Sequence, residues 1–235
     1  MEHIIYDFKS FVAALQSAGF SVASGGNDEG VFGLIKHGWD DDPGDSPVRW
    51  HTGDPDTDPW EWRMRVLDER DDIAYAKMFF RKGGYITREW YPYFLAARRG
   101  ARGFDEEYAD GAYSRECKRV YDVLRQSGAL PLEEIKARAL FTKEDKSRFD
   151  RALTDLQTGL FVTISGRRHK LSQTGEEYGW ASAMYCTAED FWPSEVFAQA
   201  AKISAEDAQS AITARVYALN PNANAKKVVK FIFGR

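Results

Sequence analysis

The stretch from residue 113 to 175 constrains the fold of this chain more than any other part of the sequence. Apolar residues recur there at helical spacing in three successive runs, 114–127, 131–139 and 142–158. Gly128 and Gly159 end the first and third runs, and the β-branched and aromatic segment 161–164 follows as a strand. Three helices followed by a β-hairpin is the order of elements in a winged-helix domain, a variant of the helix-turn-helix.

The third predicted helix has one apolar side and one polar side. The apolar side consists of Phe149, Ala152, Leu153 and Leu156. The polar side carries hydroxyl and cationic residues at steps of three or four, namely Lys143, Ser147, Arg151 and Thr154. Side chains of these types bond phosphate oxygens and base edges, so we predict that this face contacts DNA.

The segment from Ser165 to Lys170 is predicted to be the tight turn of the hairpin. Its tip would then hold His169 and the three cations Arg167, Arg168 and Lys170, which we add to the predicted nucleic-acid contacts.

Charge is segregated along the chain. Between residues 112 and 175, 13 Lys and Arg stand against 8 Asp and Glu, a local charge of +5, whereas the whole chain carries −4 and the remainder therefore −9. Segregation of this kind is typical of a surface that binds a polyanion. The alternative is that the unit is a non-catalytic protein-interaction module, with these cations as ordinary solvated residues.

The whole chain is predicted to be of the α+β class. We expect an N-terminal α+β region over 1–111, a winged-helix domain over 112–180 and a C-terminal helical extension over 181–235. In the first region a strand from Ile73 to Arg81 is expected to turn back at Lys82-Gly83-Gly84.

The run from residue 50 to 62 holds the densest cluster of reactive and aromatic side chains. His51 with the nearby aspartates offers nitrogen and oxygen ligands for a metal, but the run lacks the central glycine and terminal glutamate of an EF-hand loop. Asp58-Pro59-Trp60-Glu61 is also a helix start, with Asp58 as the N-cap and Pro59 at the first helical position. We favour the capping interpretation and predict neither a metal site nor a cofactor.

A further interpretation places the same run in a cleft that performs chemistry. His51 or Glu61 would act there as a general acid or base. Four tryptophans could form its aromatic pocket, Trp50, Trp60, Trp62 and Trp90. An extruded nucleobase needs such stacking surfaces, and this makes a hydrolase of N-glycosidic bonds a hypothesis to test.

The amino-acid composition limits the classes of protein to which this chain can belong. The chain has 43% hydrophobic and 29% charged residues, which is ordinary for a soluble globular protein. No apolar run approaches the ~18 residues of a membrane span, and the first twenty residues carry no signal-peptide pattern. Cys117 and Cys186 lie far apart on apolar stretches, which indicates buried thiols in a reducing compartment. We therefore expect a cytoplasmic protein.

Three segments, residues 50–60, 86–94 and 113–192, resemble a bacterial family of AlkZ-related, or YcaQ-like, proteins, and the likeness covers most of the chain. These proteins are named for their similarity to winged-helix DNA glycosylases that unhook alkylated or crosslinked bases. The resemblance implies a tandem winged-helix-type architecture, a DNA partner and N-glycosidic bond hydrolysis without a metal, linked to DNA repair. The larger glycosylases position water with a Gln-x-Gln or Gln-x-Asp pair, which this sequence lacks, so the resemblance transfers no catalytic residue.

Overall fold

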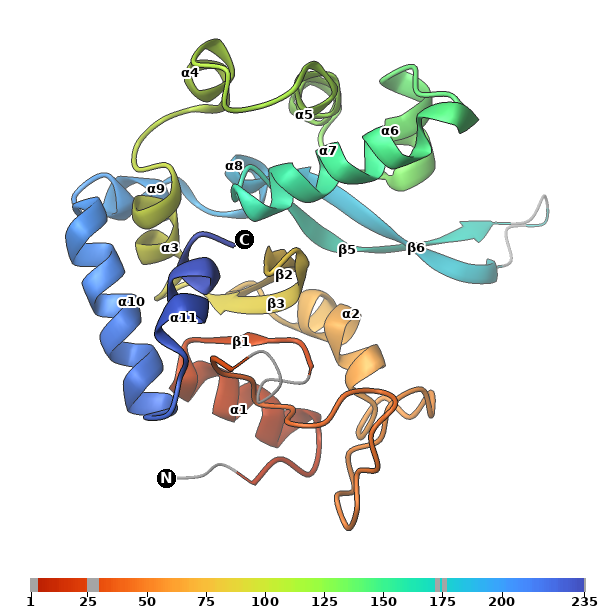
Figure 1. The fold of residues 1–235 in the computed structure, drawn as a ribbon. Helices are drawn as coiled ribbons and strands as arrows, with labels where there is room; N and C mark the ends of the chain where they lie inside the picture. Colours follow the sequence, from red (N-terminus) through yellow and green to blue (C-terminus); the bar gives the residue numbers. More distant parts are fainter. Residues whose placement is uncertain (1–3, 25–29, 172–173, 175–176, 235) are drawn as a thin grey trace. The chain divides into compact units, whose positions relative to one another are not determined.

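The computed structural model describes residues 4–24, 30–171, 174 and 177–234 (Figure 1). The chain forms two compact units, of which unit 1 comprises Met1–Ala101 with Glu195–Arg235 and unit 2 comprises Arg102–Ser194. The boundaries predicted from the sequence were 111/112 and 180/181. Both units combine helices with antiparallel strands, which confirms the predicted α+β class.

Unit 1 contains three antiparallel strands with β3 in the middle. They are β1 (Phe20–Val22), β2 (Ile73–Phe79) and β3 (Lys82–Thr87). In their register Phe20 lies opposite Ile86, and Tyr75 lies opposite Tyr85. Most residues of β2 and β3 are buried, so these strands form the centre of the unit's core.

The turn between β2 and β3 lies at Phe80 and Arg81, where φ is 49° and 60°. The prediction of a turn at Lys82-Gly83-Gly84 is therefore wrong, because all three residues belong to β3. At Gly84 an added Cβ would lie 2.3 Å from Cδ2 of Phe79. The glycine allows close packing of a ring against the strand and does not reverse the chain.

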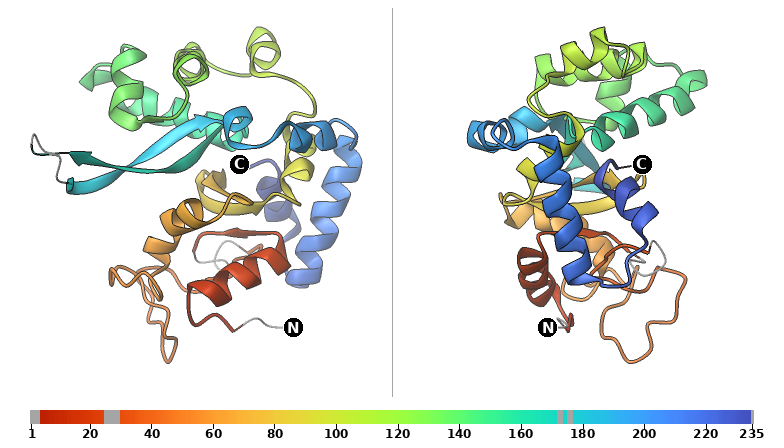
Figure 2. Two further views of the ribbon diagram at one scale, coloured as in Figure 1. Left: turned by 180° about the vertical axis from the view of Figure 1, so that it is seen from behind. Right: turned by 60° about the vertical axis from the view of Figure 1, so that its left-hand side comes forward.

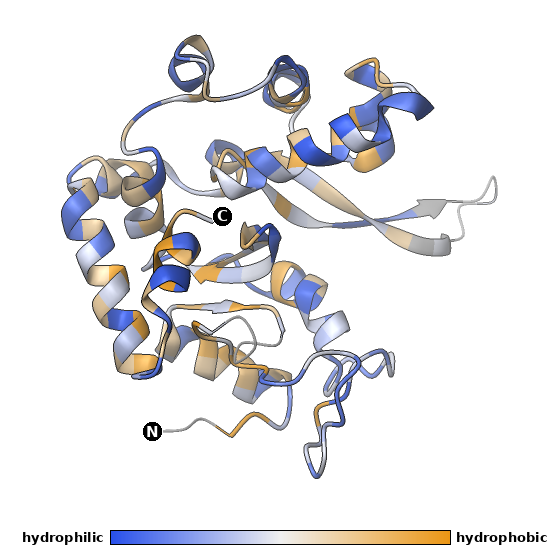
Figure 3. Ribbon diagram, in the orientation of Figure 1, coloured by the Kyte–Doolittle hydropathy of each residue, from blue (hydrophilic) through white to orange (hydrophobic). Residues whose placement is uncertain are grey.

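Helices surround these strands within unit 1. They are α1 (Phe8–Ala18), α2 (Pro59–Glu69), α3 (Tyr91–Arg98), α9 (Ser194–Ala200), α10 (Ala205–Leu219) and α11 (Ala225–Ile232). Asp7 caps α1 by accepting the Ser10 amide at 2.7 Å, and Gly19 ends the helix with φ 93°. The apolar face of α1 is buried, whereas residues 37–58, which precede α2, are largely hydrophilic (Figure 3).

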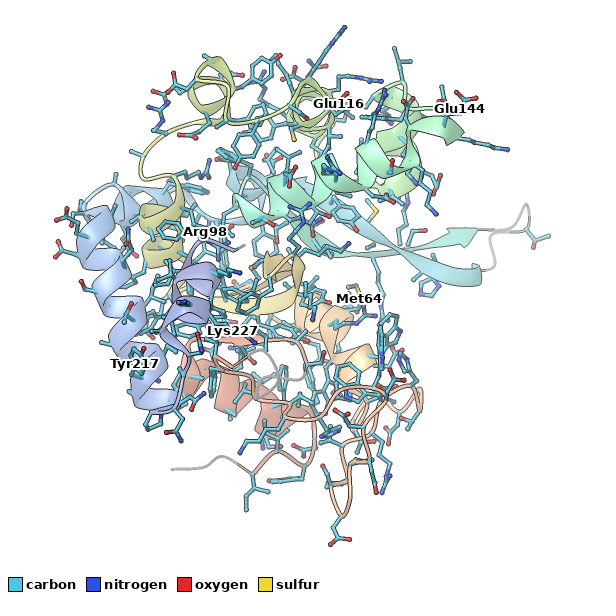
Figure 4. The ribbon with its side chains drawn as sticks, in the orientation of Figure 1. Met64, Arg98, Glu116, Glu144, Tyr217 and Lys227 are labelled. Carbon is cyan, nitrogen blue, oxygen red and sulfur yellow. The ribbon has the colours of Figure 1, made fainter. Side chains whose placement is uncertain are left out.

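The C-terminal helices complete the core of unit 1, and α10 and α11 lie side by side in each view of Figure 2. The ring of Phe231 on α11 stacks on Phe79 of β2 with 3.9 Å between centroids. Arg98, labelled in Figure 4, donates from Nε to the Ile232 carbonyl at 2.6 Å. This guanidinium meets the carbonyl end of α11, where a cation stabilises the helix dipole.

Unit 2 contains the stretch on which the sequence argument rests. Its elements are α4 (Phe104–Ala109), α5 (Arg115–Ser127), β4 (Leu130–Pro131), α6 (Leu132–Arg138), the 3₁₀ helix η1 (Lys143–Asp145), α7 (Lys146–Thr158), β5 (Val162–Leu171), β6 (Glu177–Thr187) and α8 (Ala188–Phe191). Strand β6 lies between the other two strands, because Tyr185 pairs with both Leu130 of β4 and Ile164 of β5. The three predicted helices and the hairpin strands are all present.

The predicted hairpin turn at Ser165–Lys170 is wrong. Strand β5 continues to Leu171, and within it Arg167 pairs with Ala183 and Arg168 with Ser182. The register shifts between Ile164 and Gly166, as at a β-bulge. Glycine inside a strand often marks a bulge, so the Ser-Gly signal produced an irregularity in the strand and did not reverse the chain.

The core of unit 2 is aromatic and draws on α4 as well as on the three predicted helices. Phe104 of α4 stacks on Tyr121 of α5 at 4.3 Å and meets the edge of Phe161 at 5.3 Å. Phe149 and Leu156 bring the buried side of α7 to the same cluster. The opposite side of α7 is thereby fixed toward solvent.

Candidate nucleic-acid interface

The beginning of α7 is set by a local capping arrangement. The amide and hydroxyl of Thr142 both donate to Oδ2 of Asp145, at 3.1 and 2.9 Å. This capping box begins the single 3₁₀ turn η1, so the α-helix begins only at Lys146 and not at the start of the predicted run 142–158. A 3₁₀ helix has three residues per turn instead of 3.6. The side chains of α7 therefore point in directions that differ from those expected for an α-helix starting at residue 143.

The exposed side of η1 and α7 is cationic. Its exposed basic and hydroxyl residues are Lys143, Lys146, Ser147, Arg148 and Arg151. Lys143, Ser147 and Arg151 were predicted on this face, whereas Lys146 and Arg148 were missed because the spacing was counted as α-helical from residue 143. We call this set the α7 face.

Thr154 does not belong to the α7 face. Its side chain is buried, and its hydroxyl donates to the Asp150 carbonyl at 2.7 Å. Threonine in a helix commonly makes this bond to the preceding turn, which satisfies the hydroxyl inside the unit. The prediction that Thr154 contacts nucleic acid is therefore wrong.

Acidic side chains interrupt the α7 face. Glu144, labelled in Figure 4, and Asp150 are exposed on the same elements. A shallow hollow of about 300 Å³ between the start of α5 and α7 is lined by Ser114, Glu116, Ser147, Arg148, Arg151, Ala152 and Asp155. Backbone and Ser114 hydrogen bonds lower the pKa of Glu116, so this hollow holds carboxylates beside its two arginines. Carboxylates thus offset the arginines at the end of the face next to α5, whereas the other end of the face lies next to α6.

A second hollow, of about 360 Å³, lies at that other end between α6 and η1. Lys136, Lys143 and Lys146 border it, together with Glu133, Ala137, Phe141, Thr142 and Phe149. The Lys136 ammonium lies 5.1 Å from the ring centroid of Phe149, so an aromatic floor supports one of the cations. We call these three residues the lysine trio.

Strand β5 exposes Arg167 and Arg168, as predicted, although in the middle of a strand. Arg168 donates to Glu134 of α6, and Arg138 donates to the same carboxylate at 3.0 Å. The hydrogen bond from Arg168 holds the pKa of Glu134 below its ordinary range. The side chain of Lys170 lies outside the part of the chain that the structure describes.

A separate aromatic cluster lies in unit 1 around His51, which is exposed and has φ 59°. Its ring centroid is 4.9 Å from that of Trp60, 5.9 Å from Trp39 and 6.3 Å from Trp50. The guanidinium carbon of Arg63 lies 3.3 Å from the ring centroid of Trp60. Histidine, indole and guanidinium planes thus lie together at the start of α2.

Two of the four tryptophans predicted for an aromatic pocket lie elsewhere. Trp62 is fully buried and stacks on Phe11 at 4.9 Å, and Trp90 packs against Phe20 at 5.3 Å. The aromatic cluster around His51 contains Trp39 instead, and the Trp39 side chain is 61% exposed. The one signal that could have pointed to Trp39 is its position in the polar segment 37–59, which also contains His51.

The capping interpretation of Asp58 is confirmed. This buried carboxylate accepts the amide of Trp60 at 2.8 Å, that of His51 at 3.1 Å and that of Gly53 at 2.9 Å. The backbone carbonyl of Asp58 accepts the amide of Glu61 at 3.0 Å. The backbone amides of both predicted catalytic residues, His51 and Glu61, therefore donate to this one aspartate. Among the residues that the structure describes, no three His, Cys, Asp or Glu side chains are grouped so as to hold a metal ion.

The comparison with protein families settles the relationship of this chain. A family model described as AlkZ related matches residues 5–233. The chain belongs to the AlkZ-related family. This confirms the resemblance found in the sequence and extends it over nearly the whole chain. No curated protein and no solved structure matches.

Two further observations describe this AlkZ-related protein. None of the helices in the described ranges is both long and apolar enough to cross a membrane. Cys117 and Cys186 are buried free thiols, as predicted, and burial raises the pKa of both, that of Cys186 to about 12.

Proposed function

We propose that this AlkZ-related protein binds duplex DNA through unit 2, acting as a winged helix, in the repair of alkylated bases. The family membership supports the link to repair. The element order α5–β4–α6–α7–β5–β6, with the short strand β4 paired to β6, supports the winged-helix assignment. Helix α7 is then the recognition helix, and β5 and β6 are the wing.

The observation that carries the proposal is the α7 face. Four cations are exposed within nine residues, Lys143, Lys146, Arg148 and Arg151. They gather on the first turns of the helix, where the helix dipole also favours anions. Cations at this density neutralise neighbouring phosphates of a duplex and release counterions. The core of unit 2 packs against the opposite side of α7, which determines the side of the helix that the face occupies.

Binding is tested by fluorescence anisotropy on a labelled duplex over a salt series. The double variant Arg151→Ala, Arg167→Ala is expected to weaken binding about tenfold and to flatten the salt dependence. The matched control is Lys9→Ala, Lys202→Ala, which removes two exposed cations from unit 1 and should bind like the wild type. Unchanged binding by the unit 2 variant would refute this DNA interface.

A glycosylase-like activity is the finer form of this proposal. His51 and Glu61 are its candidate acid–base residues, and Trp39, Trp50 and Trp60 supply ring surfaces beside His51. The test measures release of free base from a methylated duplex by the wild type, His51→Ala and Glu61→Gln. Release by the wild type that persists at full rate in both variants would show that neither residue is catalytic.

A second candidate function is a non-catalytic protein-interaction module. The observation that favours it is Trp39, which is 61% exposed in a segment rich in aspartate. A protein partner with a basic surface would cover such a residue. A wild type that shows no affinity for duplex DNA in low salt would favour this function over the first.

A further inference from the structure

Helix α6 ends in a strained and exposed leucine. Leu140 has φ 57°, in the left-handed region, and its side chain is 79% exposed. The Phe141 amide donates to the Lys136 carbonyl at 2.9 Å and the Leu140 amide to the Ala137 carbonyl at 3.1 Å. This is the Schellman pattern that closes many helices, and it requires a left-handed residue at position 140.

The pattern explains the backbone of Leu140 but not its side chain. Glycine or asparagine adopts the left-handed conformation at lower cost, and glycine is the usual residue here. An exposed leucine side chain contributes no burial free energy that would offset the cost of this backbone conformation. A non-glycine residue held in this region often marks a functional site.

The surroundings hold this turn in place. Arg119 of α5 donates from Nε to the Ala139 carbonyl at 2.9 Å and from Nη2 to the Leu140 carbonyl at 2.7 Å. Its guanidinium lies 4.1 Å over the ring of Phe141, which in turn meets the edge of Phe149 at 5.1 Å. Leu140 is therefore presented to solvent by a rigid support anchored in the core of unit 2.

The chemistry next to Leu140 indicates its ligand. The turn borders the hollow of the lysine trio, to which its neighbours Ala137, Phe141 and Thr142 all contribute. Lys136 already lies 4.0 Å from a carboxylate oxygen of Glu133, which lines the same hollow. A ligand must therefore offer anionic groups that bind Lys143 and Lys146 and compete with Glu133 for Lys136, together with an apolar surface for one leucine. Duplex nucleic acid offers both, because sugars and base edges lie between its phosphates.

We propose that Leu140 is an apolar DNA-contact residue that packs into a groove against sugar and base edges, while the lysine trio binds the flanking phosphates. The proposal rests on the proposed DNA-binding function and assigns it a contact residue outside the α7 face. Apolar side chains that enter a groove act through packing and unstacking, so their contribution is insensitive to salt. The lysines act through counterion release, which salt opposes.

The test uses this difference. Leu140→Gly removes the side chain and relieves the strain, Leu140→Met retains an apolar side chain, and Lys143→Ala removes one cation of the trio. Fluorescence anisotropy on a labelled duplex measures the affinity and its salt slope, which is the change of log affinity with log salt concentration. We expect Leu140→Gly to bind about tenfold more weakly than the wild type with an unchanged salt slope. Leu140→Met should bind like the wild type. Lys143→Ala should reduce the salt slope by about one. Thermal unfolding should show Leu140→Gly to be at least as stable as the wild type.

Each other outcome counts against a definite part of this proposal. Wild-type affinity in Leu140→Gly, with Lys143→Ala weakened, overturns the role of Leu140 and leaves the DNA-binding function standing. A wild type without salt-sensitive affinity for the duplex overturns both. Loss of self-association in Leu140→Gly, measured by sedimentation, with unchanged DNA affinity, makes the leucine a protein contact and also overturns the proposal.

Discussion

Arg168 on β5 donates to the carboxylate of Glu134 on α6, and this pair links the hairpin to α6. Arg138 donates to the same carboxylate from within α6. An arginine that the sequence assigned to DNA contact is therefore already neutralised by a neighbour. Both partners are substantially exposed, so the pair contributes little to stability and more to the potential that a polyanion meets.

Glu134→Gln is expected to strengthen DNA binding. The amide cannot neutralise Arg168, so one further cation becomes available to phosphate, and we expect about threefold higher affinity with a salt slope steeper by about one. Anisotropy on a labelled duplex measures both quantities. Glu195→Gln in unit 1 makes the same change of net charge at an exposed site and serves as the control. An equal gain in both variants would mean that net charge alone matters.

Asp58→Ala is expected to destabilise unit 1 by about 2 kcal/mol, because it removes a helix cap and leaves the amides of His51 and Gly53 without their acceptor. Asp58→Asn keeps one carbonyl oxygen and should lose about half as much. Urea unfolding followed by tryptophan emission reports both the stability and the surroundings of Trp60. Equal stability of the wild type and Asp58→Ala would show that this carboxylate does not organise the loop.

Features that depend on a few neighbouring residues could be predicted from the sequence. Ser114 caps α5 by accepting the amide of Cys117 at 3.2 Å, and Asp58 with Pro59 begins α2, because capping uses only the adjacent turn. The order of helices and strands in unit 2 follows from such signals together with apolar periodicity.

Features that depend on distant partners could not be predicted. Whether Ser165–Lys170 turns or continues as a strand is decided by pairing with β6, which a local pattern does not contain. The stacking of Trp62 on Phe11 in the core depends on a partner 51 residues away, and the 61% exposure of Trp39 likewise depends on which distant side chains pack near it. Of the four rings predicted for one pocket, Trp50 and Trp60 therefore lie beside His51, whereas Trp62 lies in the core and Trp90 packs against Phe20.

Gly84→Ala is expected to destabilise the protein by about 1–3 kcal/mol, because the new Cβ would lie 2.3 Å from the ring of Phe79 and 3.1 Å from the Ser21 carbonyl oxygen. Denaturant unfolding measures the change. A double-mutant cycle with Phe79→Leu isolates the cause, since a smaller side chain at 79 should reduce the cost of the alanine. Strict additivity of the two changes would show that the ring is not what excludes a side chain at position 84.

Cys186 is expected to make stability fall at alkaline pH. Burial raises the pKa of its thiol to about 12 in the folded protein, against about 8.5 in an unfolded chain. The unfolded state thus loses its proton first, so the contribution of this thiol is complete below pH 8.5 and is lost as pH rises toward 12. At pH 10 the loss is about 2 kcal/mol relative to pH 7. Cys186→Ala lacks this titration, and its free energy of unfolding, measured in urea at pH 7 and pH 10, should decline less than that of the wild type by this amount. Parallel decline in the two proteins would place the thiol in contact with solvent.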